Sequence, residues 1–128
     1  RERRARVLEL IVRTRDRRFV DLLARHVDEH AGQLTTDEAA GIGRVVGLLG
    51  GPATIARWKA WLVARPAEAR GFEGPLARQV AALLALAEIP GEEAAEALGE
   101  AFDQADEAAQ PWVLGALAQR ERTKGKPR

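Results

Sequence analysis

Apolar residues recur about every 3.6 positions along most of this 128-residue chain, and this spacing is the strongest constraint on its fold. Such a period places apolar side chains on one face of an α-helix, whereas a half-buried β-strand needs strict alternation. Alanine, leucine, glutamate and arginine favour helix and are abundant, while β-branched and aromatic residues are sparse. The sequence therefore predicts an all-α fold.

Seven helices are predicted, joined by short connections. They span residues 3–14, 17–30, 36–49, 52–65, 75–88, 91–106 and 111–121. Thr35 or Thr36 is expected to cap the third helix, and Gly50 and Gly51 are expected to end it. Residues 66–74 contain Pro and Gly and form the longest predicted loop. Short connections elsewhere favour antiparallel neighbours.

Two segments of the chain resemble each other when one is shifted by 40 residues, residues 45–62 and residues 85–102. The Gly/Pro turns coincide, and four pairs of apolar positions align: Val46 with Leu86, Leu49 with Ile89, Trp58 with Leu98 and Leu62 with Phe102. A shift of 35 toward the N-terminus aligns Ile55, Trp58 and Leu62 with Val20, Leu23 and Val27. The sequence thus predicts three helix pairs, followed by a last helix that is half of a fourth pair or a cap.

The segments LLGGPATIARW and LAEIPGEEAAEAL carry this pattern of helix, short Gly/Pro turn and helix, and the pattern resembles short bacterial HEAT-like repeats. The resemblance implies a single α-solenoid domain over residues 1–121, with an irregular helical bundle as the alternative. Its repeats would span residues 3–31, 36–65 and 75–106, with a half-repeat at 111–121. Residues 122–128 contain no apolar residue to bury and are predicted to form a disordered tail.

The stretch HVDEH, from His26 to His30, matches H-x-x-E-H, the inverted signature of zinc peptidases. The i, i+4 spacing places both imidazoles on one helical face, and Glu29 would act as general base. Glu107 could supply a third ligand, but eight acidic residues between 88 and 107 make a carboxylate near that spacing expected by chance. A helix C-terminus also favours His30 through the helix dipole. We therefore predict no metal, no cofactor and no catalytic residue, and retain a zinc-dependent hydrolase as a remote alternative.

Arg57, Trp61 and Arg65 follow one another at intervals of four on the fourth predicted helix. In the repeat register Trp61 corresponds to His26 and Arg65 to His30. In a solenoid the second helices line the concave face, so these five side chains are predicted to form a binding surface there. Indoles fill cores as readily as interfaces, so the sequence leaves open whether Trp61 is buried.

Charge is distributed unevenly, although 20 basic and 19 acidic residues leave a net charge of only +1. Residues 1–18 carry +5, residues 88–107 carry −8 and residues 119–128 carry +4. A secondary acidic surface is predicted from Glu92, Glu93, Glu96 and Glu100. These blocks would steer a charged partner or simply form solvated faces.

The glycines of AGIGRVVGLLGG form G-x-G-x-x-x-G at Gly41, Gly43 and Gly47 and invite comparison with nucleotide-binding loops. The segment lacks a preceding strand and a Gly-Lys-Ser/Thr ending, so that comparison fails. We predict instead that these small residues let the helix approach its neighbours closely.

The residue types available limit the chemistry, since Cys, Ser, Tyr, Asn and Met are all absent. The absence of Cys and of any apolar run of about 20 residues favours a cytoplasmic protein without membrane insertion. The chain begins with Arg, and we expect it to be part of a longer one. The predicted function is a non-enzymatic scaffold or adaptor that binds another protein or a flanking domain of its own chain. Nucleic-acid binding by a helical-repeat protein is the less favoured alternative.

Overall fold

The computed structural model describes residues 2–14, 16–63, 76–105 and 107–125, and the regular structure within these ranges is entirely helical. Its α-helices are α1 (Glu2–Thr14), α2 (Arg18–His30), α3 (Thr36–Gly50), α4 (Ile55–Val63), α5 (Ala77–Glu88), α6 (Glu92–Gln104) and α7 (Gln110–Gly125). Two short 3₁₀ turns are η1 (Ala31–Gln33) and η2 (Gly51–Thr54). The predicted all-α fold is confirmed.

The predicted helices agree with the observed ones to within a few residues, with two differences. The fourth begins as the 3₁₀ turn η2 before α4 starts. The last helix continues to Gly125, so residues 122–125 are helical rather than part of a disordered tail. A helix needs no apolar residue to continue, and Arg122 donates a hydrogen bond of 2.8 Å to Gln119 one turn earlier. The predicted loop at 66–74 and residues 126–128 lie outside the described residues.

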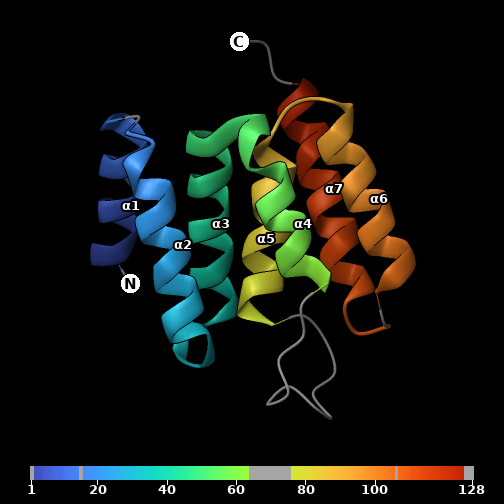
Figure 1. Cartoon of the computed structure of the whole chain (residues 1–128), viewed down its shortest axis with the longest axis horizontal. Helices are drawn as coiled ribbons and strands as arrows, with labels where there is room; N and C mark the ends of the chain where they lie inside the picture. Colours follow the sequence, from blue (N-terminus) through green and yellow to red (C-terminus); the bar gives the residue numbers. More distant parts are fainter. Residues whose placement is uncertain (1, 15, 64–75, 106, 126–128) are drawn as a thin grey trace.

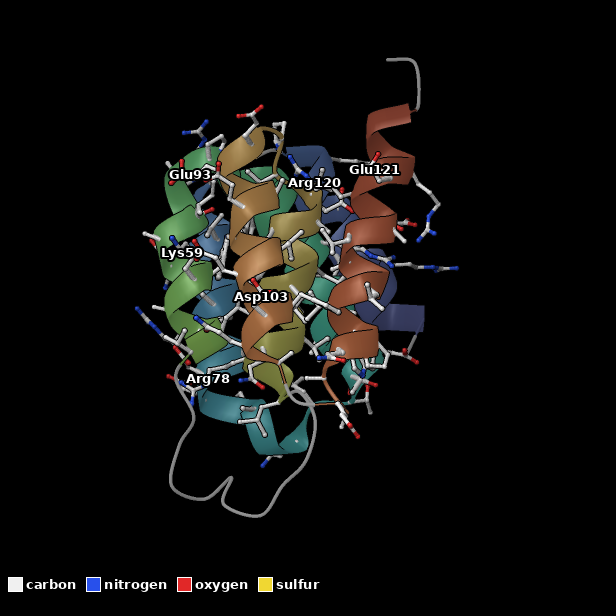
Figure 2. The ribbon with its side chains drawn as sticks, turned by 90° about the vertical axis from the view of Figure 1, so that its right-hand side faces the viewer. Lys59, Arg78, Glu93, Asp103, Arg120 and Glu121 are labelled. Atoms are coloured by element: carbon white, nitrogen blue, oxygen red, sulfur yellow. The ribbon has the colours of Figure 1, made fainter. Side chains whose placement is uncertain are left out.

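Successive helices alternate in direction, as Figure 1 shows: α1, α3, α5 and α7 run one way, and α2, α4 and α6 run the other. The view turned by 90° in Figure 2 separates these two sets, with α2 and α4 on one side and α1, α3 and α7 on the other. Ion pairs join neighbours across the fold. Arg57 of α4 contacts Asp21 of α2 at 2.6 Å, and Arg78 of α5 contacts Asp28 of α2 at 3.4 Å.

The helix α5 is the centre of the molecule, because α2, α3, α4, α6 and α7 all contact it. Every residue from Val80 to Ala87 is buried. A helix that is apolar on all sides is stable only when surrounded by protein, so the run VAALLALA dictates this central position. The five helices that contact α5 pack apolar side chains around it.

The helices α3 and α5 approach each other closely at Gly43 and Gly47. A Cβ atom added at either glycine would lie 2.8 Å from the Cα atom of Ala81 or Ala85, respectively, and would overlap the backbone there. Both pairs are four residues apart, so each forms one small-residue stripe along its helix. The prediction that small residues here allow a close helix approach is confirmed for Gly43 and Gly47. It is wrong for Gly41, where an added Cβ atom would meet only the Leu8 side chain, at an ordinary contact distance of 3.5 Å.

Two glycines with positive φ lie in the turns after α3 and after α5. Gly51 has φ of 64° and Gly91 has φ of 105°, and they lie 40 residues apart, the same shift that aligns residues 45–62 with residues 85–102. At the first turn the Thr54 hydroxyl donates to the Gly51 carbonyl at 2.8 Å. That hydroxyl also accepts a hydrogen bond of 3.0 Å from the indole nitrogen of the buried Trp58. The turn and the core are therefore linked directly.

At the second turn a single side chain from α7 satisfies the carbonyl groups at the end of α5. The guanidinium group of Arg120 donates to the carbonyl oxygens of Leu86, Ile89 and Gly91. The last carbonyls of a helix have no partner within it, so these bonds complete the C-terminus of α5. They also hold α7 against the turn between α5 and α6.

One stretch, Thr36–Val63, is long and apolar enough to cross a membrane by length and composition, with 28 residues and a hydropathy of 1.3. It comprises α3, η2 and α4, and half of its most apolar window is buried inside the fold. The turn at Gly51 folds it into two antiparallel helices (Figure 1). Contact with α5 accounts for its apolar character.

We predict that Gly47→Ala lowers the free energy of unfolding by about 1–3 kcal/mol, because the new methyl group must push α3 away from the α5 backbone. Urea unfolding followed by circular dichroism measures the change. The matched control is Gly99→Ala in α6, where an added Cβ meets nothing within 4 Å. That control should raise stability by about 0.5–1 kcal/mol. Equal effects of the two changes would show that the α3–α5 contact is not tight.

Candidate binding groove

The predicted binding surface does not form as one surface, because Trp61 belongs to the core. Its side chain is only 8% exposed and packs edge-on against Trp58, with ring centroids 5.1 Å apart. Ile55, Trp58 and Trp61 are spaced by three and form the buried face of α4. The repeat register aligned Trp61 with His26, but His26 is exposed on α2. Trp61 therefore lies in the core, whereas His26 lies at the surface.

Arg57 has a structural role at the junction of α2 and α4. Its guanidinium group pairs with Asp21 at 2.6 Å and lies 5.8 Å from the centre of the Trp58 ring. The cation covers the edge of the core while remaining partly in water. The remaining member of the predicted surface, Arg65, lies outside the described residues.

His26 and His30 are close to each other, as their i, i+4 spacing predicts. Their ring centroids are 4.8 Å apart, and the planes are tilted by 46°. Within the described residues, no group of three or more His, Asp or Glu side chains could hold a metal ion. Glu107 is in the turn between α6 and α7. These two helices lie at the opposite edge of the molecule from α1 and α2 (Figure 1). The histidine pair therefore lacks a third protein ligand in this part of the chain.

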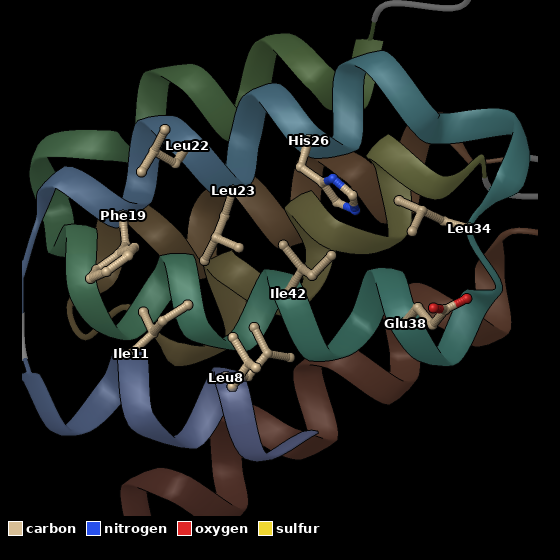
Figure 3. Close-up of a pocket in the computed structure, with 10 residues that line it drawn as sticks. Leu8, Ile11, Phe19, Leu22, Leu23, His26, Leu34, Glu38 and Ile42 are labelled. Carbon is tan, nitrogen blue, oxygen red and sulfur yellow. The ribbon is translucent and has the colours of Figure 1, made fainter. Parts of the chain in front are cut away.

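A groove of about 470 Å³ lies between α1, α2 and α3, and His26 is at one end of it (Figure 3). It is lined by Val7, Leu8, Ile11, Phe19, Leu22, Leu23, His26, Leu34, Glu38 and Ile42. Eight of these ten side chains are apolar. The groove is therefore an apolar channel with two polar side chains, His26 and Glu38, near one end.

The packing of the first two helices explains why this groove is open. Both α1 and α2 contact α3, and α3 forms the floor between them. At the start of α2 the Asp16 carboxylate accepts hydrogen bonds from the backbone N–H of Arg18 at 3.0 Å and from its guanidinium group at 2.7 Å. The side-chain hydrogen bond from Arg18 lowers the pKa of Asp16.

Large apolar side chains are exposed to solvent on both sides of the groove. Val7 of α1 is 53% exposed and Leu22 of α2 is 55% exposed, whereas Ile11 and Ile42 at the floor are buried. Phe19 and Leu23 are half-buried between them. A contiguous exposed apolar patch of this kind marks a binding surface more often than scattered apolar residues do.

The polar end of the groove is fixed in place by a helix cap. Glu38 accepts a hydrogen bond from the backbone N–H of Thr35, and the Thr35 hydroxyl accepts one from the N–H of Glu38, both at 3.1 Å. This capping box confirms Thr35 as the predicted cap of α3. It also holds the Glu38 carboxylate at the groove end near Leu34 and His26 (Figure 3).

The acidic side chains that were predicted as a secondary surface are all exposed on α6. They are Glu92, Glu93, Glu96 and Glu100. Figure 2 looks onto this helix, where Glu93 and Asp103 are labelled. The acidic face is therefore separate from the apolar groove of α1 and α2.

Sequence reasoning missed the groove, although a signal for it was present. The apolar face of α2 is broader than one buried stripe needs, since Phe19, Leu22 and Leu23 join the buried Val20 and Val27.

Comparisons of the chain with models of protein families, curated proteins and solved structures found no match. The groove is therefore interpreted from its own geometry.

We predict that Trp61→Ala lowers the free energy of unfolding by about 3–5 kcal/mol, since it removes a buried indole and leaves a cavity. Because Trp61 is buried, the change tests core packing and not the binding surface that the sequence predicted. Val63→Ala, at a side chain 68% exposed, is the control and should change stability by less than about 0.5 kcal/mol. Thermal unfolding of both variants gives the comparison. A Trp61→Ala protein as stable as the control would contradict core placement.

Proposed function

We propose that this chain is a non-enzymatic helical-repeat module that binds a helical segment of another protein in the groove between α1, α2 and α3. One observation carries the proposal: the groove is almost wholly apolar, and Val7 and Leu22, on its opposite sides, are more than half exposed. Covering each of these side chains would contribute roughly 1 kcal/mol of binding free energy. The buried floor adds a preformed surface that needs little reorganisation.

The dimensions of the groove favour a helix as the occupant. Its lining on α2 runs from Phe19 to His26, which at 1.5 Å per residue is about 10 Å, or two helical turns. An amphipathic helix presents apolar side chains at i, i+3 or i+4 and i+7 over that length. The lining is poor in cations that could neutralise phosphates, which supports a protein rather than a nucleic acid as partner.

We further propose that the architecture is a short HEAT-like stack of three helix pairs with α7 as the cap. The alternating helix directions, the two turn glycines 40 residues apart and the matching burial of Trp58 and Leu98 support this. An end pair in such a stack lacks a neighbour on one side, which fits an open groove at α1 and α2. The burial of α5 on all sides is the feature that supports the alternative, a closed bundle.

Site-specific photocrosslinking tests the proposed function. With p-benzoylphenylalanine at position 22, in the groove, we expect a defined protein product in extracts of the source cells. The control position is 48, because Leu48 is 54% exposed on α3 but does not line the groove. The crosslinked peptide should map to an amphipathic helix. Equal products from positions 22 and 48, or no protein product, would contradict the proposal.

We predict that Val7→Glu, on the side of the groove opposite position 22, lowers the crosslinking yield from that position at least about tenfold. The change places a carboxylate against the apolar face of the partner. Val7 is 53% exposed, so the fold should be unaffected. Val63→Glu is the matched control at another exposed valine and should leave the yield unchanged. A yield lowered equally by both changes would show that net charge rather than groove occupancy is being measured.

A further inference from the structure

A second cavity of about 310 Å³ lies between α3 and α7, above Leu84 of α5. From α3 it is lined by Asp37, Ala40 and Arg44, which share one helical face. From α7 it is lined by side chains that include Trp112 and Arg122. Because α3 and α7 run in the same direction, Arg44 and Arg122 lie toward one end, and Asp37 and Trp112 toward the other (Figure 1).

The polar lining of this cavity has more hydrogen-bond donors than acceptors. Within the described part of the chain, the Arg44 guanidinium group and the Trp112 indole N–H have no hydrogen-bond or ion-pair partner. Arg122 donates to Gln119 at 2.8 Å, and its other N–H groups remain available. Asp37 is seven residues from Arg44, about 10 Å along the helix, so its carboxylate does not neutralise that cation. A ligand rich in acceptors would satisfy this site.

The floor of the cavity provides room for an apolar body. Ala40 and Gly115 are small, and a Cβ atom added at Gly115 would meet nothing within 4 Å. The half-buried Trp112 side chain forms a flat wall beside them. A volume near 300 Å³ is at the lower end of ligand pockets and suits a molecule of one or two rings.

We infer that this cavity binds a small aromatic anion, a carboxylate or phosphate ester on a flat ring system. Arg44 and Arg122 hold the charged group through charge-assisted hydrogen bonds. The ring lies over Ala40 and Gly115 and packs against the Trp112 indole. This site is separate from the groove of α1 and α2, and it does not depend on the function proposed there.

Nuclear magnetic resonance of the three indole N–H groups tests the inference with 1-naphthyl phosphate as the probe. The Trp112 signal, assigned with Trp112→Phe, should shift saturably, while those of the buried Trp58 and Trp61 stay in place. Arg44→Gln should weaken binding at least about tenfold, equivalent to about 1.4 kcal/mol. Arg25→Gln, at an exposed arginine of α2 outside both cavities, should leave the affinity unchanged.

Two further ligands test the anionic and the aromatic parts of the proposed site separately. Neutral 1-naphthol should bind at least about tenfold more weakly than the phosphate ester, because it cannot pair with the arginines. Inorganic phosphate should also bind more weakly, because it has no ring to pack against the indole. Equal affinity for 1-naphthol would overturn the anion site, and equal affinity for inorganic phosphate would overturn the aromatic site. A Trp112 signal that does not move at millimolar probe would overturn both.

Discussion

The contact between α3 and α5 is the constraint on which the rest of this structure depends. Gly43 and Gly47 lie against the backbone of Ala81 and Ala85, so the two helices approach more closely than larger side chains allow. The close approach leaves α5 free to contact four other helices around its remaining sides. Dispersion between closely packed backbones and the burial of the run from Val80 to Ala87 stabilise this centre together. Each outer helix then needs only one apolar face.

Both cavities follow from this arrangement around one helix. The helix α1 contacts α3 and lies at the edge, so the space that it shares with α2 is covered on one side only. On the other side of α3, small residues such as Ala40 and Gly115 leave a gap above Leu84. The first space is apolar and the second is rich in cationic donors, so they suit ligands of different chemistry.

The sequence predicted the local features of the fold well, because those features depend on neighbours in the chain. Helical periodicity, the Thr35 cap and the glycine approach at Gly47 were all present in short segments. The position of Trp61 was not predictable in this way, since a shift of one residue between repeats moves a side chain from the surface to the core. The groove required knowing that α1 and α2 both contact α3, which depends on how three successive helices pack together rather than on the pattern within any one of them.

The hydrogen bonds that Arg120 donates to the turn between α5 and α6 have a consequence for synthesis of the chain. The carbonyl groups of Leu86, Ile89 and Gly91 leave the ribosome about thirty residues before the guanidinium group that binds them. Until then, water must hydrate the end of a helix whose residues from Val80 to Ala87 are all buried in the finished fold. Translation therefore passes through an interval in which α5 has been made but its last carbonyls have no protein donor from α7.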